Sequence, residues 1–202
     1  MLPPLSFGAI LFALLLAASP PTATAVNHTI DDTFGDSSTG FRPQYAPGFQ
    51  WSIGGPICTN CLPTSFDLDP KQLFNGTYHL ALSQNVTLTL NFTGTAIYVY
   101  NVLVNSIANS PNFSTTTNLT FALDGVRSTA STSFVHAQTN LNSNITYNAL
   151  VYSTASLPYA NHSLVMTNIG PLCFFDYAIY TTQNASALPN ASTLPRVSPH
   201  LR

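Results

Sequence analysis

The sequence predicts an all-β fold, an antiparallel β-sandwich of about eight strands with little helix outside an N-terminal leader. All seven acidic residues are Asp and none is Glu, so the long charged side chains that favour helix surfaces are scarce. Short runs of alternating apolar and polar residues are separated by Gly, Pro, Asn and Asp, which is typical of strands and turns. No window outside the leader keeps an apolar i, i+3, i+4, i+7 stripe, which predicts low helix content.

The leader, residues 1–25, has the pattern of a secretory signal peptide. An apolar run over residues 7–18 precedes a small-x-small site at residues 23–25, and we expect cleavage after Ala25. The run is about a dozen residues long, whereas a transmembrane helix needs about 20. We therefore expect a secreted protein, with an uncleaved anchor as the alternative, and no transmembrane anchor elsewhere in the chain.

The rest of the chain has the length of one domain, which we place at residues 26–182. Residues 183–202 are rich in Pro, Ser, Thr and Asn, and we expect a disordered tail there. The formal net charge is −2, so there is no basic stripe to attract phosphate groups. We expect no nucleic-acid partner.

N-x-S/T triplets with x other than Pro support an extracellular compartment, because they are acceptors for N-linked glycan. Glycans would also supply the solubility that a chain with 6% charged residues lacks. We expect several triplets to be modified, since only a buried Asn is closed to a bulky sugar. The triplets begin at Asn27, Asn75, Asn85, Asn91, Asn112, Asn118, Asn144, Asn161, Asn184 and Asn190.

Three cysteines, Cys58, Cys61 and Cys173, leave one thiol unpaired in a secreted protein. A Cys58–Cys61 bridge closes a very small loop and removes about 2 kcal/mol of chain entropy, whereas a bridge to Cys173 closes a loop of roughly 100 residues and is worth about 4 to 5 kcal/mol. Proximity along the chain favours the short bridge, which needs no folded partner. We expect Cys58–Cys61, with Cys173 as the alternative partner.

The strand signals are weak at first and then strengthen. Residues 26–48 are rich in turn residues, and we expect irregular structure with one short strand. Residues 49–53 alternate as a half-buried strand does, and residues 58–70 should form a loop. Strands follow at 77–82 and 86–92, the second with Val, Leu and Phe on one face and Thr and Asn on the other.

The strands from residue 96 onward should build the core. Residues 96–104 are apolar on both faces, which is typical of a central strand. Residues 119–123 alternate and end at Asp124-Gly125, which suits a tight hairpin turn because both positions tolerate positive φ. Further strands are predicted at residues 149–152, 163–169 and 174–180.

Five segments resemble a known domain: PKQLFNGTYH (70–79), FTGTAIYVY (92–100), LTFALDG (119–125), LPYANHSLVMTN (157–168) and FFDYAIYT (174–181). In this order the last four resemble the galactose-binding-like jelly roll. With the C-x-x-C motif, the 70–79 segment and the closing FDYAIYT, the chain resembles an uncharacterised family of fungal secreted or single-span surface proteins. The resemblance covers residues 30–182 and implies an extracellular β-sandwich, with no assigned activity to carry over. Since many members continue into a transmembrane helix, we expect a soluble member or a truncated form.

Two polar residues fall within the predicted strands. His162 precedes Leu164 by two positions, and we expect it at an edge or facing outward. Asp176 stands among aromatic residues, where a carboxylate must be hydrogen-bonded or solvated. We therefore expect Asp176 to bind neighbouring backbone or hydroxyl groups rather than to catalyse a reaction.

Carbohydrate binding is the leading functional hypothesis, because a sugar site on a β-sandwich needs an aromatic platform and a few polar side chains. The candidates lie in or near predicted loops: Trp51, Tyr78, His79, Tyr147 and Tyr159. The alternative for each is a core position, for Trp51 above all. The expected partners are glycans or wall polysaccharide. The alternative function is a structural or protein-interaction domain of the cell surface or wall.

We expect no catalytic residues and no cofactor. A glycoside hydrolase needs two carboxylates that flank the sugar, and the available pairs are Asp67 with Asp69 and Asp124 with Asp176. Asp67 and Asp69 are also candidates for a structural Ca²⁺ site, although loop capping explains them better than either alternative. The sequence has no G-x-S-x-G elbow, so a serine hydrolase is not supported.

Overall fold

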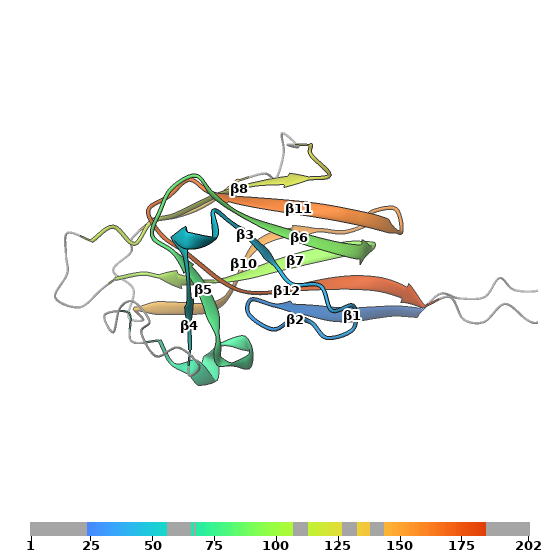
Figure 1. Ribbon diagram of the computed structural model, residues 1–202, viewed down its shortest axis with the longest axis horizontal. Coiled ribbons are helices and arrows are strands. Elements are labelled where there is room, and N and C mark those ends of the chain that lie inside the picture. The colour runs from blue at the N-terminus through green and yellow to red at the C-terminus, as the bar shows by residue number, and fades with distance from the viewer. Residues whose placement is uncertain are drawn as a thin grey trace, which may run out of the picture. The chain divides into compact units, whose positions relative to one another are not determined.

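Two antiparallel sheets pack face to face in the computed structural model (Figure 1), which confirms the predicted all-β sandwich. The structure describes residues 24–55, 66, 68–106, 113–126, 133–137 and 144–184. Residues Ala25–Asn184 form one compact unit.

The first sheet has seven strands. Its order is β10 (Ile145–Thr154), β7 (Ala96–Val104), β12 (Cys173–Asn184), β1 (Thr24–Asp31) and β2 (Gly35–Asp36), with β5 (Tyr78–Ala81) also beside β12 and β4 (Trp51–Gly54) beside β5. β7 pairs with β10 on one side and with β12 on the other. The prediction of a central strand at residues 96–104 is confirmed.

The second sheet has five strands. Its order is β3 (Gln44–Ala46), β6 (Val86–Gly94), β11 (Ala160–Asn168), β8 (Thr117–Leu123) and β9 (Ser133–His136). The helices among the described residues are three short 3₁₀ turns, η1 (Gly48–Gln50), η2 (Pro70–Gln72) and η3 (Phe74–Gly76). Within these same residues no helix is long and apolar enough to cross a membrane.

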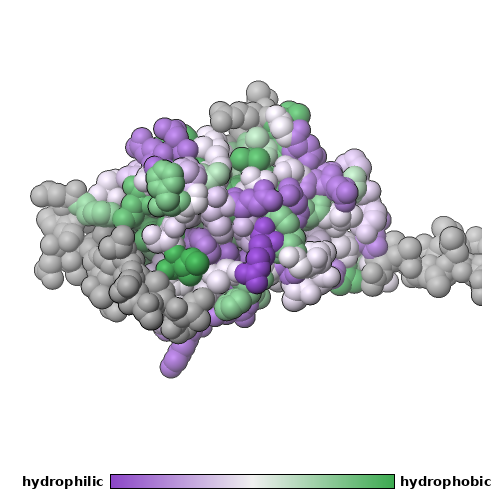
Figure 2. All heavy atoms as spheres, in the orientation of Figure 1, coloured by the Kyte–Doolittle hydropathy of each residue, from purple (hydrophilic) through white to green (hydrophobic). Residues whose placement is uncertain are grey.

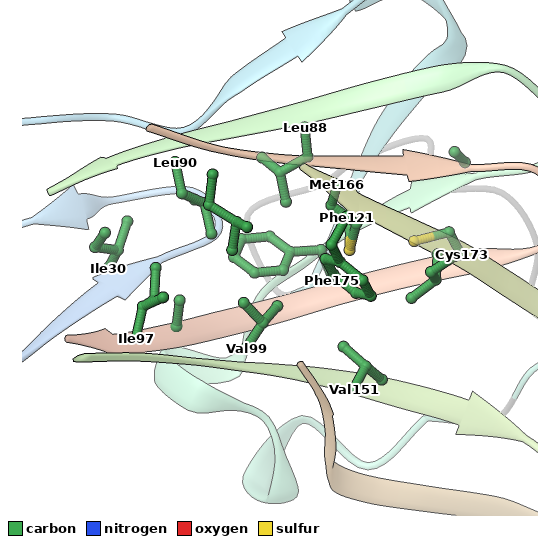
Figure 3. Close-up of a cluster of buried hydrophobic side chains, with 14 of the residues drawn as sticks. Ile30, Leu88, Leu90, Ile97, Val99, Phe121, Val151, Met166, Cys173 and Phe175 are labelled. Atoms are coloured by element: carbon green, nitrogen blue, oxygen red, sulfur yellow. The ribbon is translucent and has the colours of Figure 1, made fainter. Parts of the chain in front are cut away.

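The core lies between the sheets and follows the alternation of the strands. On β6, Leu88 and Leu90 are buried, whereas Asn91 on the opposite face is exposed. Figure 3 shows Leu88 and Leu90 directed toward Ile97 and Val99 of the other sheet. Hydrophilic and hydrophobic residues are interspersed on the surface seen in Figure 2. The buried apolar side chains thus lie mainly between the two sheets, where they form the contact that holds the sheets together.

The N-terminal segment contains more strand than its sequence predicts, since β1, β2 and β3 all lie between residues 24 and 46. β1 has an irregular burial pattern, so its alternation is a poor signal. Contacts with β12 hold it instead: the Thr181 hydroxyl donates to Asn27, and the Asp32 amide donates to the Asp176 carbonyl. The predicted cleavage point after Ala25 falls at the exposed start of β1.

The Asp124-Gly125 turn has the predicted geometry. The φ values are +51° at Asp124 and +76° at Gly125, and the backbone groups of Leu123 and Val126 bond across it in both directions. These are the positive φ values that a tight hairpin turn requires. The turn directs the Asp124 carboxylate toward the neighbouring strand β11, where Ser163 donates its backbone N–H to Oδ1 at 2.8 Å.

Candidate functional site

A groove of about 450 Å³ opens where β6 ends and β11 begins. We call it the β6–β11 groove; it is lined by Thr39, Phe41, Asn91, Phe92, Thr93, Asp124, Asn161, His162 and Ser163. Five of these side chains are hydroxyls or amides, two form a carboxylate–imidazole pair and two are phenyl rings. Its volume lies within the range of roughly 300 to 1,000 Å³ that is usual for small-ligand sites.

The segment 36–41, on one side of the groove, is held by the carboxylate of Asp36. That carboxylate accepts hydrogen bonds from the Ser38 amide and hydroxyl at 2.8 and 2.6 Å, and from the hydroxyls of Thr39 at 2.6 Å and Tyr180 at 2.7 Å. Burial opposes ionisation, but these donors outweigh it and lower the pKa of Asp36 to about 2. Asp36 is therefore an ionised anchor at neutral pH.

Backbone contacts within this segment place the ring of Phe41. The Asp36 amide donates to the Phe41 carbonyl at 2.8 Å, and the Gly40 amide donates to the Asp36 carbonyl at 2.8 Å. Gly35 has a φ of +76°, and a Cβ there would overlap the Phe41 carbonyl oxygen, so glycine is required. Phe41 is half-buried against the core and lines the groove.

The pairing of β6 with β11 brings two glycosylation triplets face to face. Asn91 is the cross-strand partner of Ser163, and Thr93 is the partner of Asn161. The Thr93 hydroxyl donates to the Asn161 side-chain oxygen at 2.5 Å. The two asparagines, one from each triplet, thus lie diagonally opposite each other on the outer face of the sheet.

Asp124 and His162 form an ion pair beside these asparagines. Nδ1 of His162 lies 2.8 Å from Oδ2 of Asp124, and Nε2 lies 2.9 Å from the Pro158 carbonyl oxygen. Both partners accept hydrogen bonds, so the two contacts together require both ring nitrogens to be protonated. Burial lowers the pKa of His162, but its bonds to Asp124 and Pro158 outweigh that effect and raise the pKa.

The two contacts hold the His162 ring in its protonated form. A histidine whose two nitrogens both donate has no lone pair with which to act as a general base. Asp176, which the sequence pairs with Asp124, is fully buried on β12 and accepts from the Phe74 amide at 3.0 Å. Among the described residues, Asp124 supplies the one carboxylate that lines the groove. The backbone hydrogen bond predicted for Asp176 is thus present at one of its two carboxylate oxygens.

The prediction that His162 lies at an edge or faces outward is wrong. Its residue surface is 8% exposed, and its ring centroid lies 5.3 Å from that of Phe92. His162 shares one strand face with Leu164 and Met166, which are both buried. The strand alternation therefore carries it inward.

Three of the five predicted ligand-binding residues do not form an exposed platform. Trp51 and Tyr78 are each 8% exposed and His79 is 7% exposed. They belong to the paired strands β4 and β5 rather than to loops. Trp51 packs against Tyr45 and Tyr78 against Phe174, with ring centroids 5.0 and 5.3 Å apart. This burial fits the alternative that these residues, Trp51 in particular, occupy core positions.

His79 belongs to a buried polar network. Its Nδ1 lies 2.7 Å from Oδ2 of Asp32, and its ring stacks on Tyr45 with centroids 3.9 Å apart. Oδ1 of Asp32 accepts from the Thr77 hydroxyl at 2.6 Å. The network joins the end of β1 to β5, so its evident role is to hold the two strands together.

The other two predicted ligand-binding residues are more accessible but separate from the groove. Tyr147 is half-buried, and its hydroxyl accepts from the Asp69 amide at 2.7 Å. Tyr159 is 52% exposed and directly precedes β11. Neither ring lines the groove.

The residues that the structure describes do not support the predicted calcium site. Asp69 uses its carboxylate to cap η2, accepting from the Lys71 amide at 3.0 Å and from Gln72 at 3.4 Å. Asp67 lies outside the described residues. Within the described ranges no group of three His, Cys, Asp or Glu side chains can hold a metal ion.

Cys173 carries a free thiol that is completely buried. Burial raises the pKa of this thiol to about 12. The alternative bridge to Cys173 is thus absent from the structure, whereas Cys58 and Cys61, the expected pair, lie outside the described residues.

The triplet asparagines differ in exposure. Asn118 is half-buried in β8, and Asn112, Asn190 and the side chain of Asn184 lie outside the described residues. The exposed ones are Asn27, Asn75, Asn85, Asn91, Asn144 and Asn161. These six can carry a glycan without disrupting the core.

The sequence did not point to the groove, although one signal was available. Asn91 lies on the polar face of the predicted strand 86–92, and the triplet that begins at Asn161 leads into the predicted strand 163–169, but nothing local says that the two strands are neighbours. Phe41 lies in a segment without periodicity. Only the strand pairing and the Asp36 contacts bring these residues together.

Comparison with known proteins adds similarity of fold alone. No protein-family model matches the chain, and no curated protein is similar to it in sequence. Among solved structures, the Agl-KA catalytic domain aligns over 87% of this chain and 30% of its own, with 12% identity and a TM-score of 0.45. A family two carbohydrate esterase from Cellvibrio japonicus aligns over 79% of this chain and 35% of its own, with 9% identity and a TM-score of 0.37.

A smaller structure aligns over its whole length. This is the CBM36-1 domain of a multidomain xylanase from the hindgut metagenome of Trinervitermes trinervoides, which covers 73% of this chain with 10% identity and a TM-score of 0.33. The chain thus spans about a third of the first two structures and all of this one. At these identities and TM-scores the likeness assigns no activity to this chain.

Proposed function

We propose that the protein is a secreted, non-catalytic domain that binds carbohydrate in the β6–β11 groove. The observation that carries the proposal is the lining, in which five hydroxyl or amide side chains and the Asp124–His162 pair lie beside the ring of Phe41. A sugar presents hydroxyls that both donate and accept, and a C–H face that packs on an aromatic ring. The groove offers partners for both.

The non-catalytic part of the proposal is supported by His162 and by the one carboxylate that lines the groove among the described residues. Hydrogen bonds to Asp124 and to the Pro158 carbonyl occupy both imidazole nitrogens. A bound sugar would therefore meet a charged pair whose histidine has no lone pair with which to accept a proton.

Secretion is supported by the leader and by the exposure of six triplet asparagines. We also propose, on the sequence motifs alone, that the chain belongs to the fungal family of secreted or single-span surface proteins described above. Glycans or wall polysaccharide would be its partners.

A second candidate function is a structural or protein-interaction domain of the cell surface or wall. Asn91 and Asn161 favour it, because both line the groove and both are glycosylation acceptors. A glycan on either asparagine would block the groove, so that an outside saccharide could not enter and the domain would act through other surfaces.

The test is binding of the full chain, produced without N-glycans, to a panel of soluble oligosaccharides and insoluble wall polysaccharides. We expect saturable binding of at least one saccharide and a loss of about tenfold in affinity for Phe41→Ala, equivalent to about 1.4 kcal/mol. Phe49→Ala is the matched control, because Phe49 is 87% exposed and lies outside the groove. A folded chain that binds no saccharide in the panel contradicts the proposal.

A further inference from the structure

Asn91 is placed to carry a glycan that lies within the groove. It is exposed, it lines the groove, and its side-chain amide makes no hydrogen bond among the described residues. The side-chain oxygen of Asn161, by contrast, accepts a hydrogen bond from the Thr93 hydroxyl, which fixes the orientation of that side chain. Of the two groove asparagines, Asn91 is therefore the one whose side chain is free to turn toward the groove.

The surroundings of Asn91 suit the first sugar of such a glycan. The half-buried ring of Phe41 offers an apolar surface, and the Asn161 amide lies diagonally across the neighbouring strand. Diagonal neighbours of this kind are about 7 to 8 Å apart, so one sugar unit on Asn91 is within reach of Asn161. An N-acetylhexosamine also brings an acetamido group that can hydrogen-bond to such an amide.

We propose that Asn91 is N-glycosylated and that the first N-acetylhexosamine of this glycan packs against Phe41 in the β6–β11 groove. The proposal rests on the proposed function, since both place a sugar in the same groove. It makes the chain's own glycan the resident ligand. An outside saccharide binds only where Asn91 is bare.

The modification is an ordinary group transfer in the secretory pathway. The side-chain nitrogen of Asn91 forms a bond to the anomeric carbon of a lipid-linked oligosaccharide diphosphate. The bond from that carbon to the diphosphate oxygen breaks, the lipid diphosphate leaves, and the amide nitrogen loses one proton. The acceptor triplet Asn91-Phe92-Thr93 supplies the required hydroxyl residue.

The first measurement is glycopeptide mass spectrometry and thermal unfolding of the full chain secreted from glycosylating cells. We expect Asn91 to be occupied and Asn91→Gln to lower the melting temperature by about 2 to 4 °C. The same substitution should have no effect in the Phe41→Ala background, because the packing partner is gone. A bare Asn91, or an equal shift in both backgrounds, overturns the proposal.

The control variant removes a triplet outside the groove. Asn85 is exposed and has a φ of +60°, a conformation that Asp tolerates, so Asn85→Asp abolishes that acceptor without strain. It should leave the melting temperature within about 1 °C of the wild type. An effect as large as that of Asn91→Gln would point to general glycan stabilisation and overturn the proposal.

Enzymatic trimming gives a test that needs no variant. An endoglycosidase that leaves one N-acetylhexosamine on each Asn should preserve the melting temperature, whereas complete removal should lower it by about 2 to 4 °C. If complete removal has no effect on the melting temperature, the proposal fails.

Binding of free N,N′-diacetylchitobiose separates this proposal from the proposed function. We expect the unglycosylated chain to bind this disaccharide at least tenfold more tightly than the glycosylated chain does. Equal binding by both forms overturns the proposal and leaves the proposed function standing. If the unglycosylated chain binds no saccharide while the Asn91 glycan still stabilises the fold through Phe41, the proposed function fails and this proposal stands.

Discussion

Tyr180 donates its hydroxyl to Oδ2 of Asp36 at 2.7 Å, a hydrogen bond between residues 144 positions apart in the chain. It ties the last strand to the segment that carries Phe41. Burial raises the pKa of the Tyr180 phenol to about 12, whereas the pKa of Asp36 is lowered to about 2. At neutral pH the pair is therefore a phenol that donates to a carboxylate.

Asp36→Ala should lower the free energy of unfolding by about 3 kcal/mol, because it leaves the donors of Ser38, Thr39 and Tyr180 without their acceptor. Tyr180→Phe removes one of these bonds and should cost about 1 kcal/mol. Urea unfolding at pH 7 measures both. Equal effects of the two variants would contradict the central role of the carboxylate.

Asp36 should also contribute to acid unfolding. Its folded pKa is depressed, so its contribution is present above the unfolded pKa of about 3.9 and is lost as the pH falls through about 2. Compared with the wild type, Asp36→Ala should lose less stability between pH 4 and pH 2. A parallel loss in the two proteins would show that other carboxylates control acid unfolding.

The ion pair of His162 with Asp124 should make the protein less stable at alkaline pH. The folded pKa of His162 is raised, so its contribution is complete below the unfolded pKa of about 6.5 and is lost as the pH rises through the folded value. His162→Gln should remove this part of the decline, measured as the free energy of unfolding from pH 5.5 to 9. An unchanged decline would mean that His162 does not titrate with folding.

Asp176 should also make the protein less stable as the pH rises, for a different reason. Burial, with the nearby charges of Asp32 and Asp31, raises the pKa of Asp176 to about 7, and its Oδ2 has no hydrogen-bond partner among the described residues. The folded state therefore holds a proton that the unfolded state releases above about pH 3.9, and stability falls as the pH rises from about 4 to about 7.

Asp176→Asn should flatten that decline while its side-chain oxygen still accepts from the Phe74 amide. We expect the variant to be more stable than the wild type at pH 8 and to differ less at pH 4, as measured by urea unfolding at the two values. If Asp176→Asn destabilises the protein equally at both, the carboxyl group is not protonated in the fold.

Cys173 should resist thiol reagents until the protein unfolds. The thiol is fully buried and its pKa is raised to about 12. A reagent therefore cannot reach the sulfur, and the reactive thiolate form is not populated at neutral pH. Iodoacetamide labelling followed by mass spectrometry should modify Cys173 in denaturant only. With Cys58 and Cys61 bridged as predicted, the native protein should take up no label; labelling of Cys173 under native conditions would contradict its burial.

The strands that the sequence predicts well are those whose own residue pattern is clear whichever strands they pair with. Residues 96–104 are apolar on both faces and form β7 over the same range. The alternation on β6 indicates by itself which side chains face the core. β1 lacks such a pattern, and its pairing with β12 depends on residues about 150 positions away. No local signal contains that information.

The sequence alone determined the all-β class, the central strand and the Asp124-Gly125 turn, because strand period and turn chemistry are local properties. The tertiary structure decided where the aromatic rings lie and which polar residues meet. Trp51, Tyr78 and His79 are buried because β4 and β5 pair with each other within the first sheet. The groove exists because antiparallel register sets Asn91 opposite Ser163, and register is a relationship between strands that neither strand encodes by itself.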